Sequence, residues 1–112
     1  LEITRFNLDK VLQRAVNLNA LKAHAKSLEL ICNVDPAVPS LLLGDPLRIQ
    51  QILVNLISNA VDVLHELRIK NPVIEVKAIG LGDKVIITIK DNGTTDRLGK
   101  IVGEGHLAHR FH

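Results

Sequence analysis

Apolar and polar residues follow two different spacings along the chain, and these spacings predict which segments are helices and which are strands. Apolar residues recur every three or four positions over residues 8–27 and again over residues 46–67, which predicts two helices. Alternating or short apolar segments predict strands at 1–6, 28–34, 38–43, 73–79 and 84–90. Turn residues at 80–83 join the last two strands into a β-hairpin.

The second helix has the clearest pattern in the chain. Asp45 is expected to cap it and Pro46 to take its first position, where no N–H donor is needed. Most of its circumference is apolar, and its polar residues share one stripe: Arg48, Gln51, Asn55, Asn59, Asp62 and Glu66. Asn and Asp are poor residues for a helix interior. This stripe either faces water or meets a polar ligand.

Composition limits the classes of function. At 112 residues the chain is expected to form one domain, and its formal net charge of +2 does not indicate a nucleic-acid partner. Cys32 is the only cysteine, which excludes an internal disulfide and indicates a reducing, cytoplasmic setting. No apolar run has the length of a membrane span and the N-terminus has no signal-peptide pattern, so we expect no membrane contact by this domain.

The segment from Gly44 to Ala60 carries a recognisable motif. It reads Gly-Asp-Pro-x-Arg-Ile-x-Gln-Ile-Leu-x-Asn-Leu-Ile-x-Asn-Ala and resembles the N box of sensor histidine kinases, which belong to the GHKL ATPase superfamily. The resemblance implies that Asn59 binds a magnesium ion carried by the phosphates of ATP, for which an amide oxygen is a suitable ligand. Asn55 and Asn59 are therefore the candidate catalytic residues, and ATP and Mg²⁺ are the expected cofactors.

A second motif lies at the end of the hairpin. Asp91-Asn92-Gly93 resembles the start of the family's first glycine box, in which the Asp accepts a hydrogen bond from the adenine amino group and the Gly lets the backbone approach the base. Asp62 is similarly placed to an Asp in the Asn-x-x-Asp-Ala motif of ATP-hydrolysing relatives. The resemblance therefore predicts a nucleotide site formed by Asn59, Asp62, Asp91 and Gly93.

The family implies an α+β fold of the Bergerat type, a two-layer α/β sandwich whose mixed sheet is covered on one face by helices. We assign residues 1–93 to this ATP-binding domain. Residues 94–112 depart from the family, with Thr95 at the second Gly of the box, and are expected to be a divergent or truncated tail in place of the lid and second glycine box. Within them Gly103 and Gly105 are candidate phosphate-binding residues, although an ordinary loop is the alternative. His106, His109 and His112 are expected in a solvated tail rather than in a metal site.

The function implied by the resemblance is that of the ATP-binding catalytic domain of a two-component sensor histidine kinase. Such a domain positions Mg-ATP for phosphoryl transfer to a histidine on a separate domain of the same kinase and, through it, to a response regulator. The full-length kinase is expected to be a dimer, and the isolated chain to be inactive. One alternative is a degenerate, non-catalytic module for binding or dimerisation. A second alternative is an enzyme of the superfamily that hydrolyses ATP. This alternative is disfavoured because Asn55 stands where those enzymes carry a water-activating Glu.

Overall fold

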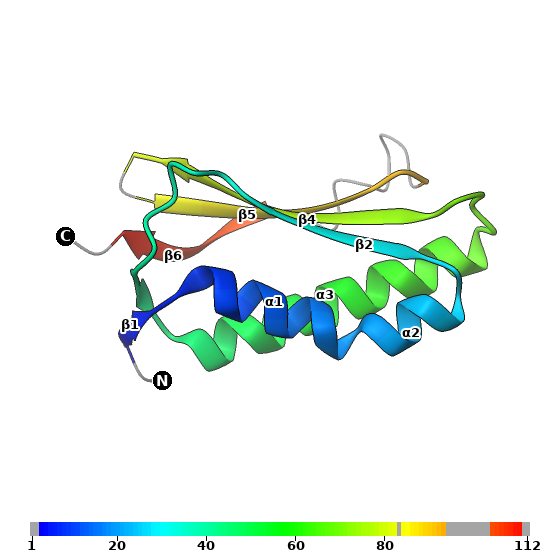
Figure 1. Cartoon of the computed structure of the whole chain (residues 1–112), viewed down its shortest axis with the longest axis horizontal. Helices are drawn as coiled ribbons and strands as arrows, with labels where there is room; N and C mark the ends of the chain where they lie inside the picture. Colours follow the sequence, from blue (N-terminus) through cyan, green and yellow to red (C-terminus); the bar gives the residue numbers. More distant parts are fainter. Residues whose placement is uncertain (1–2, 83, 94–103, 111–112) are drawn as a thin grey trace.

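The computed structural model describes residues 3–82 and 84–93, together with the backbone of residues 104–110. Its elements form two layers, with a twisted sheet on one side and the helices on the other (Figure 1). This is the predicted α+β sandwich, with a mixed sheet covered on one face. No helix in this described part combines the length and apolar character needed to cross a bilayer.

In the part of the chain that the structure describes, the sheet has six strands in the order β1-β3-β6-β5-β4-β2. The strands are β1 Thr4–Phe6, β2 Glu29–Val34, β3 Leu42–Gly44, β4 Val73–Leu81, β5 Lys84–Asp91 and β6 Glu104–Arg110. β2 pairs in parallel with β4, whereas all other neighbours pair antiparallel. The β4–β5 pair is the predicted hairpin, and β2 and β1 are the two edge strands.

Within the described residues three helices form the second layer: α1 Leu8–Leu18, α2 Ala20–Ala25 and α3 Pro46–Glu66. The Asn7 side chain caps α1 and that of Asp45 caps α3, whose first residue is Pro46 as predicted. The core lies between the layers and is aliphatic. Its buried members on the sheet and on α3 are Phe6, Leu42, Ile74, Val76, Ala78, Val85, Ile87, Ile89, Ile49, Leu53, Ile57, Ala60, Val61 and Leu64.

The prediction of one helix over residues 8–27 is wrong, because the chain forms two helices separated at Asn19. Asn19 is 4% exposed. Its side-chain amide donates to the carbonyl of Ala15 at 3.3 Å and to that of Val54 on α3 at 3.2 Å. A side chain that bonds the backbone offers it an alternative to continued helix. The break therefore arises from a contact between α1 and α3 that apolar spacing does not report.

The sequence analysis predicted no strand in the tail, but the backbone of Glu104–Arg110 forms β6 between β3 and β5. Leu43 lies opposite His109 and Ile87 lies opposite Gly105 in these ladders. β6 thus connects the β1–β3 pair to the rest of the sheet. Sequence spacing could not predict this, because the partners are distant in the chain and the segment has few apolar residues.

Candidate functional site

The two asparagines of the N-box motif lie one turn apart on α3. Both are exposed, although the opposite side of the same helix is buried against the sheet. Within the part of the chain that the structure describes, neither side-chain amide has a hydrogen-bond partner. Two amide groups thus stand free in water at positions where Ala or Lys would be better helix formers. Their polar atoms are available to a ligand.

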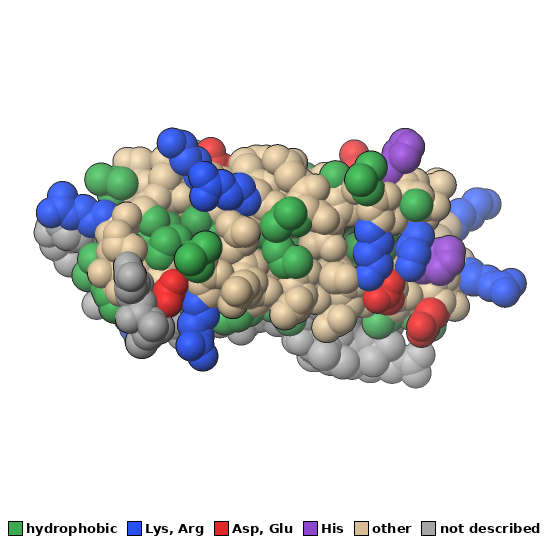
Figure 2. All heavy atoms as spheres, turned by 90° about the horizontal axis from the view of Figure 1, so that it is seen from below, with side chains coloured by type: hydrophobic (Ala, Val, Ile, Leu, Met, Phe, Trp, Pro, Cys, Tyr) green, Lys and Arg blue, Asp and Glu red, His purple; other side chains and the backbone are tan. Residues whose placement is uncertain are grey.

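Apolar side chains lie beside these amides on α3. Ile52, Val63 and Leu67 are 36%, 37% and 47% exposed. Ile52 is seven residues before Asn59 and Val63 is four residues after it, so helical spacing puts all three on one face. Figure 2 shows the helical side of the molecule, where green hydrophobic side chains are interspersed with charged groups. This face therefore offers both amide ligands and apolar surface.

Asp62 has a different environment. It forms ion pairs with Lys22 on α2 at 2.9 Å and with Lys26, the C-cap of α2, at 3.0 Å. The Lys22 ammonium also donates to Ser58 Oγ at 2.7 Å. Hydrogen bonds from Lys22 and then Lys26 hold the pKa of Asp62 below its usual range. The Asp62 carboxylate is thus directed toward α2, and its nucleotide role stays a prediction.

Sequence analysis missed this lysine pair. Lys22 and Lys26 are four residues apart in the sequence, and Lys22 lies in α2 while Lys26 is its C-cap. The four-residue spacing signals two side chains that share one face of a helix. It does not say which carboxylate they meet, because the contact with Asp62 spans 36–40 residues of sequence.

The Asp91-Asn92-Gly93 segment ends β5 and is held by several hydrogen bonds. Asp91 Oδ1 accepts the Gly93 N–H at 3.0 Å, closing a tight local turn. The Asn92 side chain accepts the Val73 N–H at 2.9 Å and donates to the Asn71 carbonyl at 2.9 Å. Asp91 lies opposite the fully buried Ile74 in the β4–β5 ladder. It is therefore on the sheet face that meets the helices, as the alternation predicted.

Gly93 contacts the C-terminal end of α3. A Cβ atom there would meet Leu64 Cδ2 at 2.8 Å and would collide with Ile69 Cγ1. Only glycine fits without displacing these side chains. Because Leu64 is five residues after Asn59, about 7.5 Å of helix rise separates this contact from the asparagine. The fold therefore brings the end of β5 to the same half of α3 as Asn59.

The structure does not test the two predicted residues of the second glycine box as parts of this site. Gly105 lies in β6, and Gly103 falls outside the described residues, as does Thr95. Their phosphate-binding role stays a prediction. Among the described residues no group of three or more His, Cys, Asp or Glu side chains could hold a metal ion.

Comparison with known proteins supplies the context for this geometry. No protein-family profile matches the chain. The chain is 49% identical over 61 residues to the sensor histidine kinase GacS of Pseudomonas protegens, and 46% identical over 61 residues to the histidine-protein kinase BarA of Escherichia coli. The match covers 54% of this chain in both cases.

Solved structures with the same fold are histidine kinase catalytic domains. One crystal form of the ThkA catalytic domain superposes with a TM-score of 0.68 and 24% identity, covering 83% of this chain and 60% of that one. Acinetobacter baumannii AdeS gives 0.67 and 19%, covering 83% and 43%. This chain is similar to the ATP-binding domain of sensor histidine kinases. The histidine-kinase-like domain spans only 7% of the length of GacS and BarA, so it corresponds to a small part of such proteins.

Proposed function

We propose that this histidine-kinase-like domain binds ATP with magnesium and positions the γ-phosphate for transfer to a histidine on a separate domain. The observation that carries the proposal is the pair of exposed amides at Asn55 and Asn59, without partners among the described residues, on a helix whose opposite side is buried. Full-length ShkA, a structural neighbour at 24% identity, is described in complex with AMPPNP. That similarity supports a nucleotide as the ligand here.

Asn59 is the residue that fits the magnesium ion of the nucleotide. Its amide oxygen is a hard ligand and has no competing hydrogen bond within the described chain. Asp62, one turn further along α3, is already neutralised by two lysines. Magnesium bound to the phosphates would supply charge neutralisation, while Asn59 would fix where those phosphates lie.

Asp91 fits the adenine base. A carboxylate has two oxygens and about four acceptor positions, and the Gly93 N–H takes one of them. An ionised carboxylate only accepts hydrogen bonds, which is the chemistry that an exocyclic amino group requires. The hydrogen bonds of Asn92 to Val73 and Asn71 would hold this group in place before the nucleotide arrives.

The chemistry proposed is transfer rather than hydrolysis. An amide cannot remove a proton from water near neutral pH, so Asn55 is unsuited to act as a general base. Phosphoryl transfer depends mainly on positioning and on stabilising charge. The nucleophile would be a histidine on another domain of the same dimeric kinase, in the cytoplasmic part of a sensor protein. A response regulator is the final acceptor in this scheme, and ThkA is described in complex with the response regulator TrrA.

Calorimetric titration of the chain with ATP, once in the presence of magnesium and once in the presence of EDTA, tests the proposal. We expect dissociation constants between micromolar and millimolar, about −8 to −4 kcal/mol. Asn59→Ala should weaken binding about tenfold in magnesium and have little effect in EDTA. The control is Gln51→Ala, an exposed residue two turns earlier on α3 that also has no partner in the described chain. Equal affinity of Asn59→Ala and the parent chain in magnesium would refute the assignment.

A further inference from the structure

Within the described part of the chain, β2 has one edge that no other strand pairs with. It is the last strand in the sheet order, and its one neighbour is β4. The backbone N–H groups of Glu29 and Asp35 donate to the carbonyls of Pro72 and Ala78, at 3.0 and 2.9 Å. Odd-numbered residues of the strand therefore bond the β4 side. The backbone groups of the even-numbered residues point out of the sheet at its free edge: Leu30, Cys32 and Val34.

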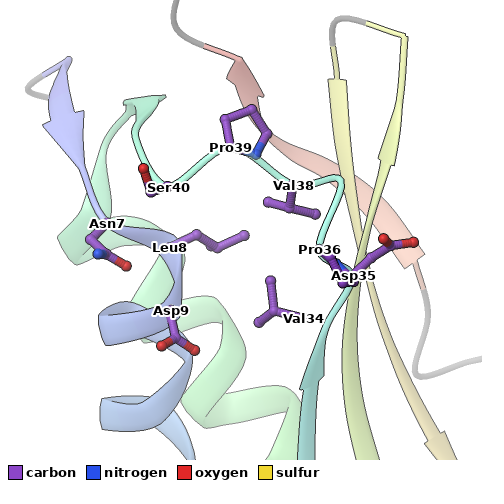
Figure 3. A pocket seen from close by; sticks show the side chains of 9 residues that line it. All are labelled: Asn7, Leu8, Asp9, Val34, Asp35, Pro36, Val38, Pro39 and Ser40. Carbon is purple, nitrogen blue, oxygen red and sulfur yellow. The ribbon is translucent and has the colours of Figure 1, made fainter.

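Side chains of β2 alternate between the two faces of the sheet. The even-numbered residues pack against the core, above α1 and α2 in Figure 1. Figure 3 shows the alternation at the end of the strand, where Val34 points toward the start of α1 and Asp35 points to the other side of the sheet. Glu29, Ile31 and Asn33 lie on that outer face, which no described helix covers.

β2 lacks the features that usually keep strand edges from pairing. Natural edge strands are often short, or carry lysine, proline or a bulge. β1, at the opposite end of the described sheet, has only three residues. β2 has six residues without proline, lysine or arginine, and its one charged residue is Glu29 at the first position. Its free edge is therefore long enough and open enough to accept another strand.

We propose that this edge pairs antiparallel with β2 of a second copy of the chain, about a two-fold axis at Ile31. In this register Ile31 lies opposite Ile31 of the second copy, and Leu30 exchanges backbone hydrogen bonds with Cys32. Glu29 lies opposite Asn33, whose amide donates one N–H to Glu75 and has a second N–H to donate. Lys77, the neighbour of Asn33 on β4, adds a positive charge on the same face.

Neighbouring registers match less well. With the axis at Cys32, Glu29 would lie opposite Asp35 of the second copy and Ile31 opposite Asn33. With the axis at Leu30, Glu29 would lie opposite Ile31. Like charges directly opposite each other destabilise a sheet, whereas apolar pairs stabilise it. The sequence of β2 therefore selects the axis at Ile31. This interface does not include α3, so it is independent of nucleotide binding.

Sedimentation of the full chain tests for the dimer. We expect a reversible monomer–dimer equilibrium between about 10 µM and 1 mM, because a single strand pair makes a small interface. Ile31→Lys places two like charges opposite each other at the axis and should weaken the dimer at least about fivefold. Ile79→Lys, on the same face of β4 but away from the edge, is the matched control and should dimerise like the parent chain. Thermal melts will verify that both variants fold.

Oxidative cross-linking tests the register. At a non-hydrogen-bonded antiparallel pair the two Cα atoms lie about 4.5 Å apart, which is within reach of a disulfide. In a Cys32→Ala background, Ile31→Cys should therefore form a covalent dimer on a non-reducing gel. Asn33→Cys in the same background should not, because its partner is Glu29.

Three outcomes would overturn the proposal. The first is a parent chain that stays monomeric up to about 1 mM. The second is a dimer that Ile79→Lys weakens as much as Ile31→Lys does, which would place the interface on the open face of the sheet instead of its edge. The third is a disulfide between the Cys32 residues of two parent chains, which would place the axis at Cys32.

Discussion

Two kinds of polar residue on α3 differ in how their hydrogen bonds are satisfied. Asn55 and Asn59 have exposed amides with no partner in the described chain, whereas Asp62 is bound by two lysines of the α2 region. Pairing a polar group can contribute to stability, but an unpaired, exposed amide on a helix contributes nothing to it. The free amides are therefore the residues that a ligand-binding role explains best.

Base selection is predicted to depend on Asp91. ATP presents an amino group to this carboxylate, whereas GTP presents a carbonyl that would oppose it. A lost charged hydrogen bond is worth about 2–3 kcal/mol, so ATP should bind at least tens-fold more tightly than GTP. Asp91→Asn can keep the bond to the Gly93 N–H and turn its NH₂ group toward the base, which should remove the preference. Competition calorimetry will measure both affinities, with Glu66→Gln as the control, and equal binding of ATP and GTP by the parent chain would contradict the assignment.

The Asp62 ion pairs predict a pH dependence of stability. The lowered pKa means that the carboxylate is stabilised as an anion in the folded state. This contribution is complete above the ordinary Asp pKa of about 3.9 and is lost as pH falls through the lower folded value. Since the side chain is 45% exposed, solvent screening should keep the gain below about 1 kcal/mol.

Thermal melts from pH 7 to pH 3 will test this prediction. Asp62→Asn should melt at a lower temperature than the parent chain at neutral pH, and the difference should shrink as the pH falls below about 3.9. Glu66→Gln, one turn later on α3, should show no such difference. A gap that persists undiminished at pH 3 would mean that packing, not charge, accounts for the effect of Asp62.

At the scale of elements, α1 is joined to α3 through Asn19. Its buried amide donates to carbonyls of both helices, so it acts as a polar connection within an apolar interface. Asn19→Ala should lower the free energy of unfolding by about 1–2 kcal/mol. Asn19→Asp should cost more, because its carboxylate would face two carbonyl oxygens without a donor. Urea denaturation will measure both variants, and equal stability of the two would show that the donated bonds are unimportant.

The contact between β5 and α3 predicts the cost of adding a methyl group at Gly93. Gly93→Ala should destabilise the fold by about 1–3 kcal/mol, because the new Cβ collides with Ile69 and comes within 2.8 Å of Leu64 Cδ2. Ile69→Ala removes the first collision, so the double variant should be more stable than the sum of the two single effects. Strictly additive effects in denaturant melts would place Ile69 away from Gly93.

At the scale of the molecule, β6 lies between β3 and β5 and joins the two parts of the sheet. Removing residues 94–112 should therefore lower the denaturant midpoint and broaden the transition, because β1 and β3 would lose their connection to the hairpin. Removing only residues 111–112, which follow β6, is the control and should have no effect. A chain of residues 1–93 with unchanged stability would show that the ATP-binding domain ends at Gly93, as the sequence analysis predicted.

The local pattern of the chain determined most of the elements. Caps and periodicity predicted α3 to within one residue of its end, and the alternation around residues 80–83 predicted the β4–β5 hairpin. The motif at Gly44–Ala60 was sufficient to indicate the similarity to sensor histidine kinases, because it lies within one helix and its approach. These features depend on residues that are close in the chain, where spacing alone decides which side chains share a face.

Contacts between distant residues were decided only by the tertiary structure. The break at Asn19 requires the Val54 carbonyl of α3, and the pairing of Asp62 requires lysines 36–40 residues away. The place of β6 between β3 and β5 depends on backbone hydrogen bonds to strands far away in the chain. The sequence by itself thus determined which residues are candidates for chemistry. Which of them stay free for a ligand and which are used for packing or ion pairs depends on neighbours that only the fold provides.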